Sequence, residues 1–129
     1  MIVADASVVV AAVMESGTAG VAARHAMSHG ACAPAHLDAE VGSALRRLVL
    51  HGALPATRAG TALRDLAALP LMRAPLPPLL AEAWRYRDEV SFYDSLYVSL
   101  ARALKIPLVT ADRGLARAAN RHCEVRLLT

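Results

Sequence analysis

Short apolar runs along this chain alternate with longer segments in which apolar residues recur every three or four positions. A short run is typical of a buried strand, and the wider spacing is typical of a helix with one face on a core. The clearest helical pattern spans residues 36–51, where one side carries Leu37, Val41, Ala44, Leu45 and Leu48. Gly52 then ends the helix, as glycine commonly does.

Extended to the whole chain, the patterning predicts strands at residues 2–6, 31–35, 69–76, 107–110 and 124–128. Helices are expected at residues 7–15, 18–28, 36–51, 55–69, 77–89, 91–105 and 113–120. Strands that alternate with helices favour an α/β fold with a mainly parallel sheet and right-handed crossovers. In such sheets ligands bind at the carboxyl ends of strands, near a switch in strand order.

The length and composition of the chain predict one domain over residues 1–129. The chain is 56% hydrophobic but only 4% aromatic, so alanine, valine and leucine must fill the core. No apolar run approaches the roughly 18 residues of a membrane span, and no basic segment precedes the first apolar residues. We therefore expect a cytoplasmic protein without a membrane segment.

Cysteine, histidine and basic residues carry weaker signals. Cys32 and Cys123 form no C-x-x-C motif and are expected to be reduced core thiols. The five histidines lack metal-binding spacing and are expected at the surface or beside helices. The net charge is +3, and Lys105 is the only lysine among the 14 basic residues. Arginine suits phosphate recognition, so the charge indicates a polyanionic partner, though weakly.

Five acidic residues occupy positions of chemical interest. Asp5 and Asp112 each follow a predicted strand, although each could instead cap the helix that comes next. Asp94 fits a capping box that begins at Ser91. Its helix is apolar nearly all round, however, so its carboxylate should be partly enclosed and in need of a cation or a proton. Glu40 and Asp38 flank opposite edges of one apolar stripe, and the helical wheel does not choose between them.

Taken together, these acids suggest a common site. The ends of the first and fourth strands can be neighbours, and the starts of the intervening helices face the same crevice. Two unit charges about 4 Å apart repel by roughly 4 kcal/mol at an effective dielectric near 20. Such a cluster persists only if it is protonated or neutralised, and oxygen ligands alone select hard cations such as Mg²⁺ or Mn²⁺.

Four stretches carry a family resemblance: VADAS, HLDAEVGSALRRL, SFYDSLYVSLARAL and IPLVTADRGLARAA. In this order and at these intervals they resemble the PIN-domain nucleases, and the chain length resembles the VapC toxins of bacterial toxin–antitoxin pairs. The resemblance implies a three-layer α/β/α fold around a mainly parallel sheet of about five strands. It also implies a Mg²⁺- or Mn²⁺-dependent endoribonuclease.

Carried over residue by residue, the resemblance places the four family acids on Asp5, Glu40, Asp94 and Asp112. The context E-V-x-x-x-L selects Glu40 rather than Asp38. Asp5, Asp94 and Asp112 are expected to bind one or two divalent ions, and Glu40 to bind the second ion or orient the attacking water. Ser7 and Thr110 match small hydroxyl positions and are expected to support the metal ligands by hydrogen bonding.

The same resemblance implies three partners: an RNA substrate, a VapB-type antitoxin and a second copy of the chain in a homodimer. The antitoxin is expected to place an amphipathic helix in an apolar groove on helices 7–28 and 36–51. The candidate phosphate-binding residues are Arg46, Arg47, Arg113 and Arg117.

Three other classes of protein are alternatives to a PIN-domain nuclease. A receiver-type signalling domain also clusters acids around Mg²⁺, but it needs an adjacent acid pair where this chain has Ala4-Asp5-Ala6. A phosphohydrolase of the D-x-D type needs a second aspartate where Ser7 stands. A non-catalytic RNA-binding module is compatible with the sequence and stays open.

Overall fold

Five short parallel strands form the central sheet, in the order β3-β2-β1-β4-β5. The computed structural model describes residues 1–129. The strands are β1 (Ile2–Ala4), β2 (Ala31–Pro34), β3 (Met72–Ala74), β4 (Leu108–Thr110) and β5 (Val125–Leu127). Val3 on β1 pairs with Cys32 on one side and Leu108 on the other, so β1 is the central strand. The predicted parallel sheet is confirmed.

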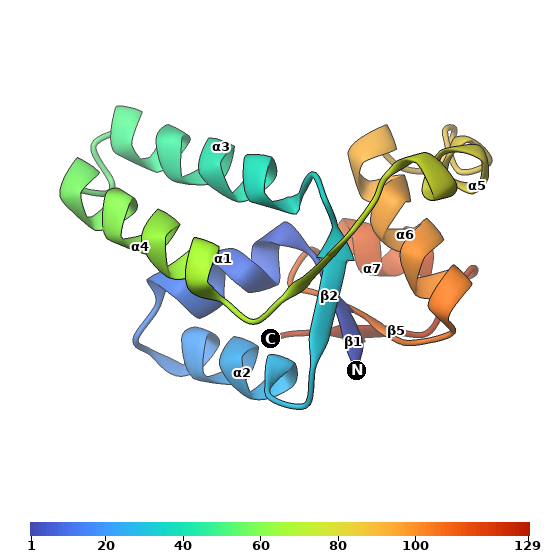
Figure 1. Ribbon diagram of the computed structural model, residues 1–129, viewed down its shortest axis with the longest axis horizontal. Coiled ribbons are helices and arrows are strands. Elements are labelled where there is room, and N and C mark those ends of the chain that lie inside the picture. The colour runs from blue at the N-terminus through green and yellow to red at the C-terminus, as the bar shows by residue number, and fades with distance from the viewer.

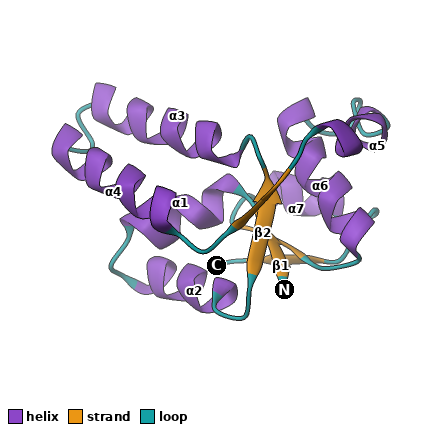
Figure 2. Cartoon of the chain, viewed as in Figure 1, coloured by secondary structure: helices purple, strands orange, loops and turns teal.

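The helices form one layer on each face of this sheet (Figures 1 and 2). One layer holds α1 (Ala6–Met14), α2 (Thr18–Met27), α3 (Leu37–Leu50) and α4 (Ala56–Ala68). The other holds α5 (Leu80–Trp84), α6 (Phe92–Leu104) and α7 (Arg113–Ala119). The chain moves from β1 toward β3 and then returns past β1 to β4 and β5. Right-handed crossovers in opposite directions place helices on opposite faces, so the three-layer α/β/α fold follows.

Alanine, valine and leucine fill the core, as the composition predicts, and Tyr97 is its largest fully buried side chain. Cys32 lies in this core, whereas Cys123 is half-buried at its edge, and both thiols are free. No single helix is long and apolar enough to cross a membrane. Helices α1 and α2 reach that length only as a pair, and the pair bends by 117°.

Three predicted boundaries were wrong. The helix expected at 77–89 is a 3₁₀ turn, Pro77–Leu79, followed by the short α5, because most amides after Ala83 bond carbonyls three residues back rather than four. The strand expected at 69–76 keeps only Met72–Ala74, since Pro70 and Pro75 have no N–H for the sheet. The first strand ends at Ala4 because Asp5 already caps α1.

The topology gathers several helix starts at one edge of the sheet. β1 and β4 are adjacent, yet the helices that follow them lie on opposite faces, which makes their carboxyl ends a switch point. Helix α3 leaves from the carboxyl end of β2. Helix α6 runs back toward the start of β4, so its first turn lies at this same edge. The first turns of α1, α3, α6 and α7 therefore meet there.

Candidate active site

Asp5 is the most enclosed acid at this edge, with 5% of its surface exposed. Its carboxylate accepts hydrogen bonds from Ser7 Oγ at 2.5 Å, Thr110 Oγ1 at 2.5 Å and the Val8 amide at 3.2 Å. Burial raises the pKa of Asp5 despite these three donors, and the charge of Asp112 adds to that effect. Asp5 thus caps α1 and also faces the neighbouring acid.

Ser7 and Thr110 lie far apart in the sequence, yet their side chains link the ends of β1 and β4. Besides contacting Asp5, Ser7 Oγ accepts a hydrogen bond from the Ala111 amide at 2.9 Å. Thr110 Oγ1 accepts one from the Asp112 amide at 3.0 Å. The two hydroxyls therefore fix the Asp5 carboxylate and the backbone that leads into Asp112 as one unit.

Asp112 caps the next helix in the same manner as Asp5. Its carboxylate accepts a hydrogen bond from the Leu115 amide at 3.1 Å and is otherwise exposed. The capping interpretation therefore holds for both acids, and it is compatible with a role for them at a site. A cap occupies one oxygen of a carboxylate and leaves further lone pairs for a cation.

Asp94 lies in the first turn of α6, where its amide donates to Ser91 Oγ at 3.1 Å. Its half-buried carboxylate, by contrast, has no basic partner, and a hydrogen bond with Ser91 is the only contact that acts to lower its pKa. Burial raises the pKa of Asp94, and the charges of Glu40, Asp5 and Asp112 raise it further, in that order. The four predicted acids therefore share one electrostatic neighbourhood, which we call the acid edge.

The structure separates Glu40 from Asp38, which the helical wheel could not do. Asp38 forms a two-pronged ion pair with Arg73, at 2.9 and 3.2 Å, away from the acid edge. Glu40 instead accepts hydrogen bonds from Tyr97 Oη at 2.7 Å and from His36 Nε2 at 3.1 Å. Burial acts to raise the pKa of Glu40, but these bonds outweigh it and hold that pKa below its usual range.

His36 and Tyr97 are site residues that the sequence patterning missed. Nε2 of His36 faces two acceptors, the Glu40 carboxylate and the Tyr93 carbonyl at 3.0 Å, so this nitrogen carries a proton. The four-residue spacing of His36 and Glu40 was an available signal. Tyr97 looked like a core residue, and nothing local in the sequence places its hydroxyl on an acid 57 residues away.

The acid edge has the donor chemistry of a divalent-cation site without a closed ligand cage. No three His, Cys, Asp or Glu side chains lie close enough together to hold a metal ion in this arrangement. Four carboxylates repel one another, and helix amides hold Asp5 and Asp112. All the donors are oxygens, however, and no basic side chain pairs with the Asp94 carboxylate. A hard divalent ion such as Mg²⁺ or Mn²⁺ therefore fits the chemistry of these residues.

The four candidate phosphate-binding arginines lie in different places. Arg47 lines a pocket together with Glu40, beside the acid edge. Arg46, its neighbour on α3, lines the apolar groove between α3 and α4 instead. Arg113 and Arg117 are exposed on α7, and Arg113 directly follows Asp112. Arg46 is thus the candidate with the least support.

The sequence matches the PIN domain over residues 2–121. The chain therefore belongs to the PIN-domain family, and its similarity over nearly its whole length makes it VapC-type within that family. Ribonuclease VapC1 of Mycobacterium tuberculosis is 43% identical over 128 residues, which cover 98% of this chain and 96% of that protein. Ribonuclease VapC12 of the same organism is 32% identical over 128 residues, which cover 99% of both chains.

A solved structure shares the fold. The crystal structure of PAE2754 from Pyrobaculum aerophilum superposes with a TM-score of 0.67, over 96% of this chain and 87% of that one. The two sequences are 22% identical, so this likeness concerns the fold alone.

Proposed function

We propose that this protein is an endoribonuclease that hydrolyses RNA phosphodiester bonds with a divalent metal ion, as the toxin of a toxin–antitoxin pair. The observation that carries the metal requirement is the half-buried Asp94 carboxylate, which has no basic partner and is acted on by the charges of three other acids. Full-length similarity to VapC ribonucleases supports the substrate class.

Asp5, Asp94 and Asp112 would hold Mg²⁺ or Mn²⁺, and Glu40 would hold a second ion or orient the attacking water. When bound, the metal lowers the pKa of a water molecule and neutralises charge on the scissile phosphate. Thr110 and Ser7 keep Asp5 in one orientation.

Around Glu40, the Tyr97 hydroxyl and His36 hold the carboxylate ionised and in place. Asp94 makes no ion pair, so its carboxylate is available to an incoming cation.

The alternatives fit less well. A receiver-type signalling domain needs a lysine near its acids. Lys105 is the only lysine and follows α6 at the opposite edge of the sheet, where β4 begins. A non-catalytic RNA-binding module would have no need for a half-buried carboxylate without a basic partner, because such a group costs free energy.

The expected partners follow from the same proposal. A VapB-type antitoxin would place an amphipathic helix in an apolar groove, and the groove lined by Leu45, Val49 and Leu63 between α3 and α4 is a suitable surface. The protein is expected to form a homodimer. Co-expression with the antitoxin, followed by measurement of the mass of the complex, tests both expectations.

The central experiment is cleavage of a structured RNA by the purified protein with Mg²⁺, with Mn²⁺ and with EDTA. Cleavage should require the divalent ion and yield a 5′-phosphate and a 3′-hydroxyl. Equal cleavage in EDTA would rule out the metal mechanism. RNA that is bound but never cleaved at any metal concentration would favour the binding module.

A further inference from the structure

Aromatic residues are scarce in this chain, yet most of them are exposed around the start of α6, the helix that carries Asp94. The chain has five, and Tyr86 and Tyr97 are buried. The other three are exposed where α5 ends and α6 begins: Trp84 at 60%, Phe92 at 39% and Tyr93 at 62%. A chain with so few large rings would be expected to bury them first, so their exposure at one corner indicates a binding surface.

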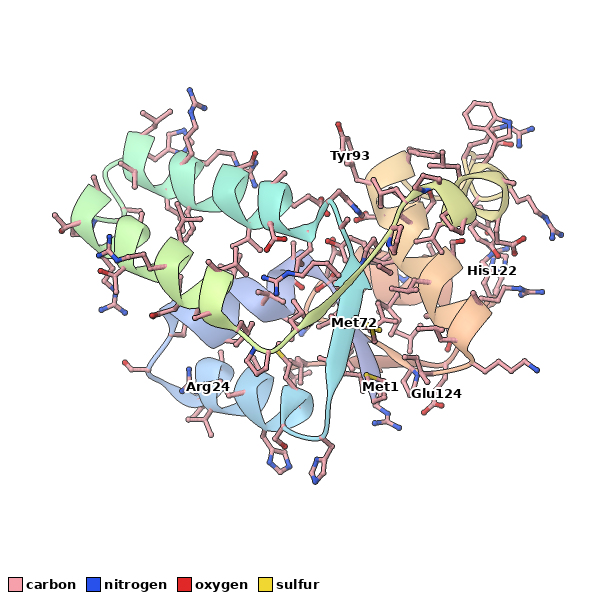
Figure 3. All side chains as sticks on the ribbon, viewed as in Figure 1. Met1, Arg24, Met72, Tyr93, His122 and Glu124 are labelled. Atoms are coloured by element: carbon pink, nitrogen blue, oxygen red, sulfur yellow. The ribbon has the colours of Figure 1, made fainter.

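Tyr93 also lines a pocket that includes a residue of the acid edge. The pocket has a volume of about 360 Å³ and is lined by His36, Ala39, Glu40, Ser43, Arg47 and Tyr93. This volume lies within the range of about 300–1,000 Å³ that is common for small-ligand sites. In Figure 3 the Tyr93 side chain leaves the start of α6 and points away from the sheet. The His36 ring lies 6.0 Å from the Tyr93 ring, centroid to centroid.

The α3 side of the pocket is a polar stripe that leads away from the acid edge. His36, Glu40, Ser43 and Arg47 follow one another at spacings of four, three and four residues, which places them on one helix face. Arg47 is exposed, and none of the ion pairs in the structure includes it. It lies about 10 Å along the helix axis from Glu40, at 1.5 Å per residue. A guanidinium at that distance suits a phosphate that neighbours the scissile one.

We propose that this pocket is a nucleotide subsite, in which the Tyr93 ring stacks on an unpaired base and Arg47 binds the phosphate of that nucleotide. The proposal rests on the proposed ribonuclease function and adds two positioning residues to it. Stacking requires a base outside a duplex, because a paired base already has neighbours on both faces. An exposed ring beside an unpaired guanidinium is a common way to hold single-stranded RNA.

The test compares Tyr93→Ala with Tyr93→Phe on short single-stranded RNAs that carry the mapped cleavage site. Each RNA is used intact and with the base removed from one nucleotide on either side of that site. Tyr93→Ala should raise KM by about 5- to 150-fold, the range for one stacked base, with kcat unchanged. Tyr93→Phe keeps the ring and should cleave like the wild type.

The decisive comparison is between intact and abasic RNA. For the wild type, removing the stacked base from the RNA should raise KM by a factor similar to that of Tyr93→Ala. For Tyr93→Ala, removing the base should raise KM no further. A rise in KM that is the same for both RNAs, or no rise, would overturn the proposal. So would a change in oligomeric mass in Tyr93→Ala without a change in base discrimination, since the ring would then belong to an interface between copies.

Arg47→Gln and Arg46→Gln form a matched pair on adjacent residues of α3. Removing Arg47 should make the plot of log RNA affinity against log salt concentration less steep by about 0.7, the value for one phosphate contact to a single strand. Removing Arg46, which lines the other groove, should leave the slope unchanged. Equal slopes for the two variants would contradict the role of Arg47.

Binding of the same RNAs in EDTA, measured by fluorescence anisotropy, separates the two proposals. If the protein cleaves nothing but still distinguishes intact from abasic RNA, the ribonuclease proposal fails and the subsite stands. If it cleaves with metal but never distinguishes the two RNAs, the subsite proposal fails alone.

Discussion

Two groups of acids in this molecule have opposite surroundings. Glu82 lies beside Arg85 and Arg102, at 3.2 and 3.4 Å, and accepts a hydrogen bond from Tyr86 Oη. This hydrogen bond is the largest influence and, with the two arginines, lowers the pKa of Glu82. Asp94 has no such neighbours, and burial among other acids raises its pKa.

Glu89 repeats the first pattern in the same region, between Arg121 at 2.6 Å and His122 at 3.0 Å. The hydrogen bond from His122, followed by the charges of His122 and Arg121, lowers the pKa of Glu89. We call Glu82 and Glu89 with these neighbours the paired acids. The contrast shows that this fold can pair its carboxylates with arginines but pairs none of the acid edge in this way, where His36 beside Glu40 is the one basic partner. The proposed divalent ion would supply the missing charge there.

The sharpest test of this contrast replaces one acid from each group. Asp94→Asn keeps the volume and removes the charge, so RNA cleavage should fall by at least about 100-fold, more than is usual for a residue that only supports a metal ligand. Glu82→Gln should leave cleavage unchanged. The measurement is the initial rate in Mg²⁺. Equal losses in the two variants would mean that the acid edge has no special role.

A second prediction concerns the hydroxyl that holds Asp5. Thr110→Val keeps the shape but removes the hydrogen bonds to Asp5 and from the Asp112 amide, so Mg²⁺ should bind about 10- to 100-fold more weakly. Thr110→Ser keeps the hydroxyl and serves as the control. Activity measured against Mg²⁺ concentration provides the readout, and wild-type behaviour of Thr110→Val would remove Thr110 from the site.

A third prediction concerns stability without metal. The pKa of Asp5 is raised in the folded state, so its charge destabilises the fold at neutral pH. Asp5→Asn should therefore raise the free energy of unfolding at neutral pH in EDTA, while abolishing cleavage. The difference in the free energy of unfolding between Asp5→Asn and the wild type should shrink as pH falls through the raised pKa of Asp5 and vanish near the ordinary value of 3.8. Urea unfolding at several pH values measures it, and a destabilised Asp5→Asn would contradict the argument.

The smallest expected effect belongs to the paired acids and has the opposite sign. The pKa of Glu82 is lowered in the folded state, so its charge stabilises the fold above the ordinary value of 4.5. Glu82→Gln should lower the free energy of unfolding by about 0.2–1 kcal/mol at neutral pH, since the pair is near the surface. The difference should fade as pH drops below 4.5 through the lowered pKa. The same pH trend in Asp5→Asn and Glu82→Gln would erase the contrast.

Much of the fold was predictable because its signals are local. The three-to-four spacing of apolar residues marks α3 and α6, and the prediction of a parallel sheet followed from the alternation of strands and helices. The length of α5 was not predictable in this way. The Pro77-Pro78 pair marks a helix start, but the end of the helix depends on a chain of three-residue turns through Glu89.

Local patterning indicated which acids follow strands and which begin helices, but the strand order, which places β1 beside β4, was also needed to bring Asp5, Asp94 and Asp112 to one edge of the sheet. The E-V-x-x-x-L context selected Glu40 over Asp38 by resemblance, and the packing gives the physical reason, with Arg73 against Asp38 and Tyr97 against Glu40. A helical wheel shows which face a side chain occupies. It does not show what packs there, because those partners come from distant parts of the chain.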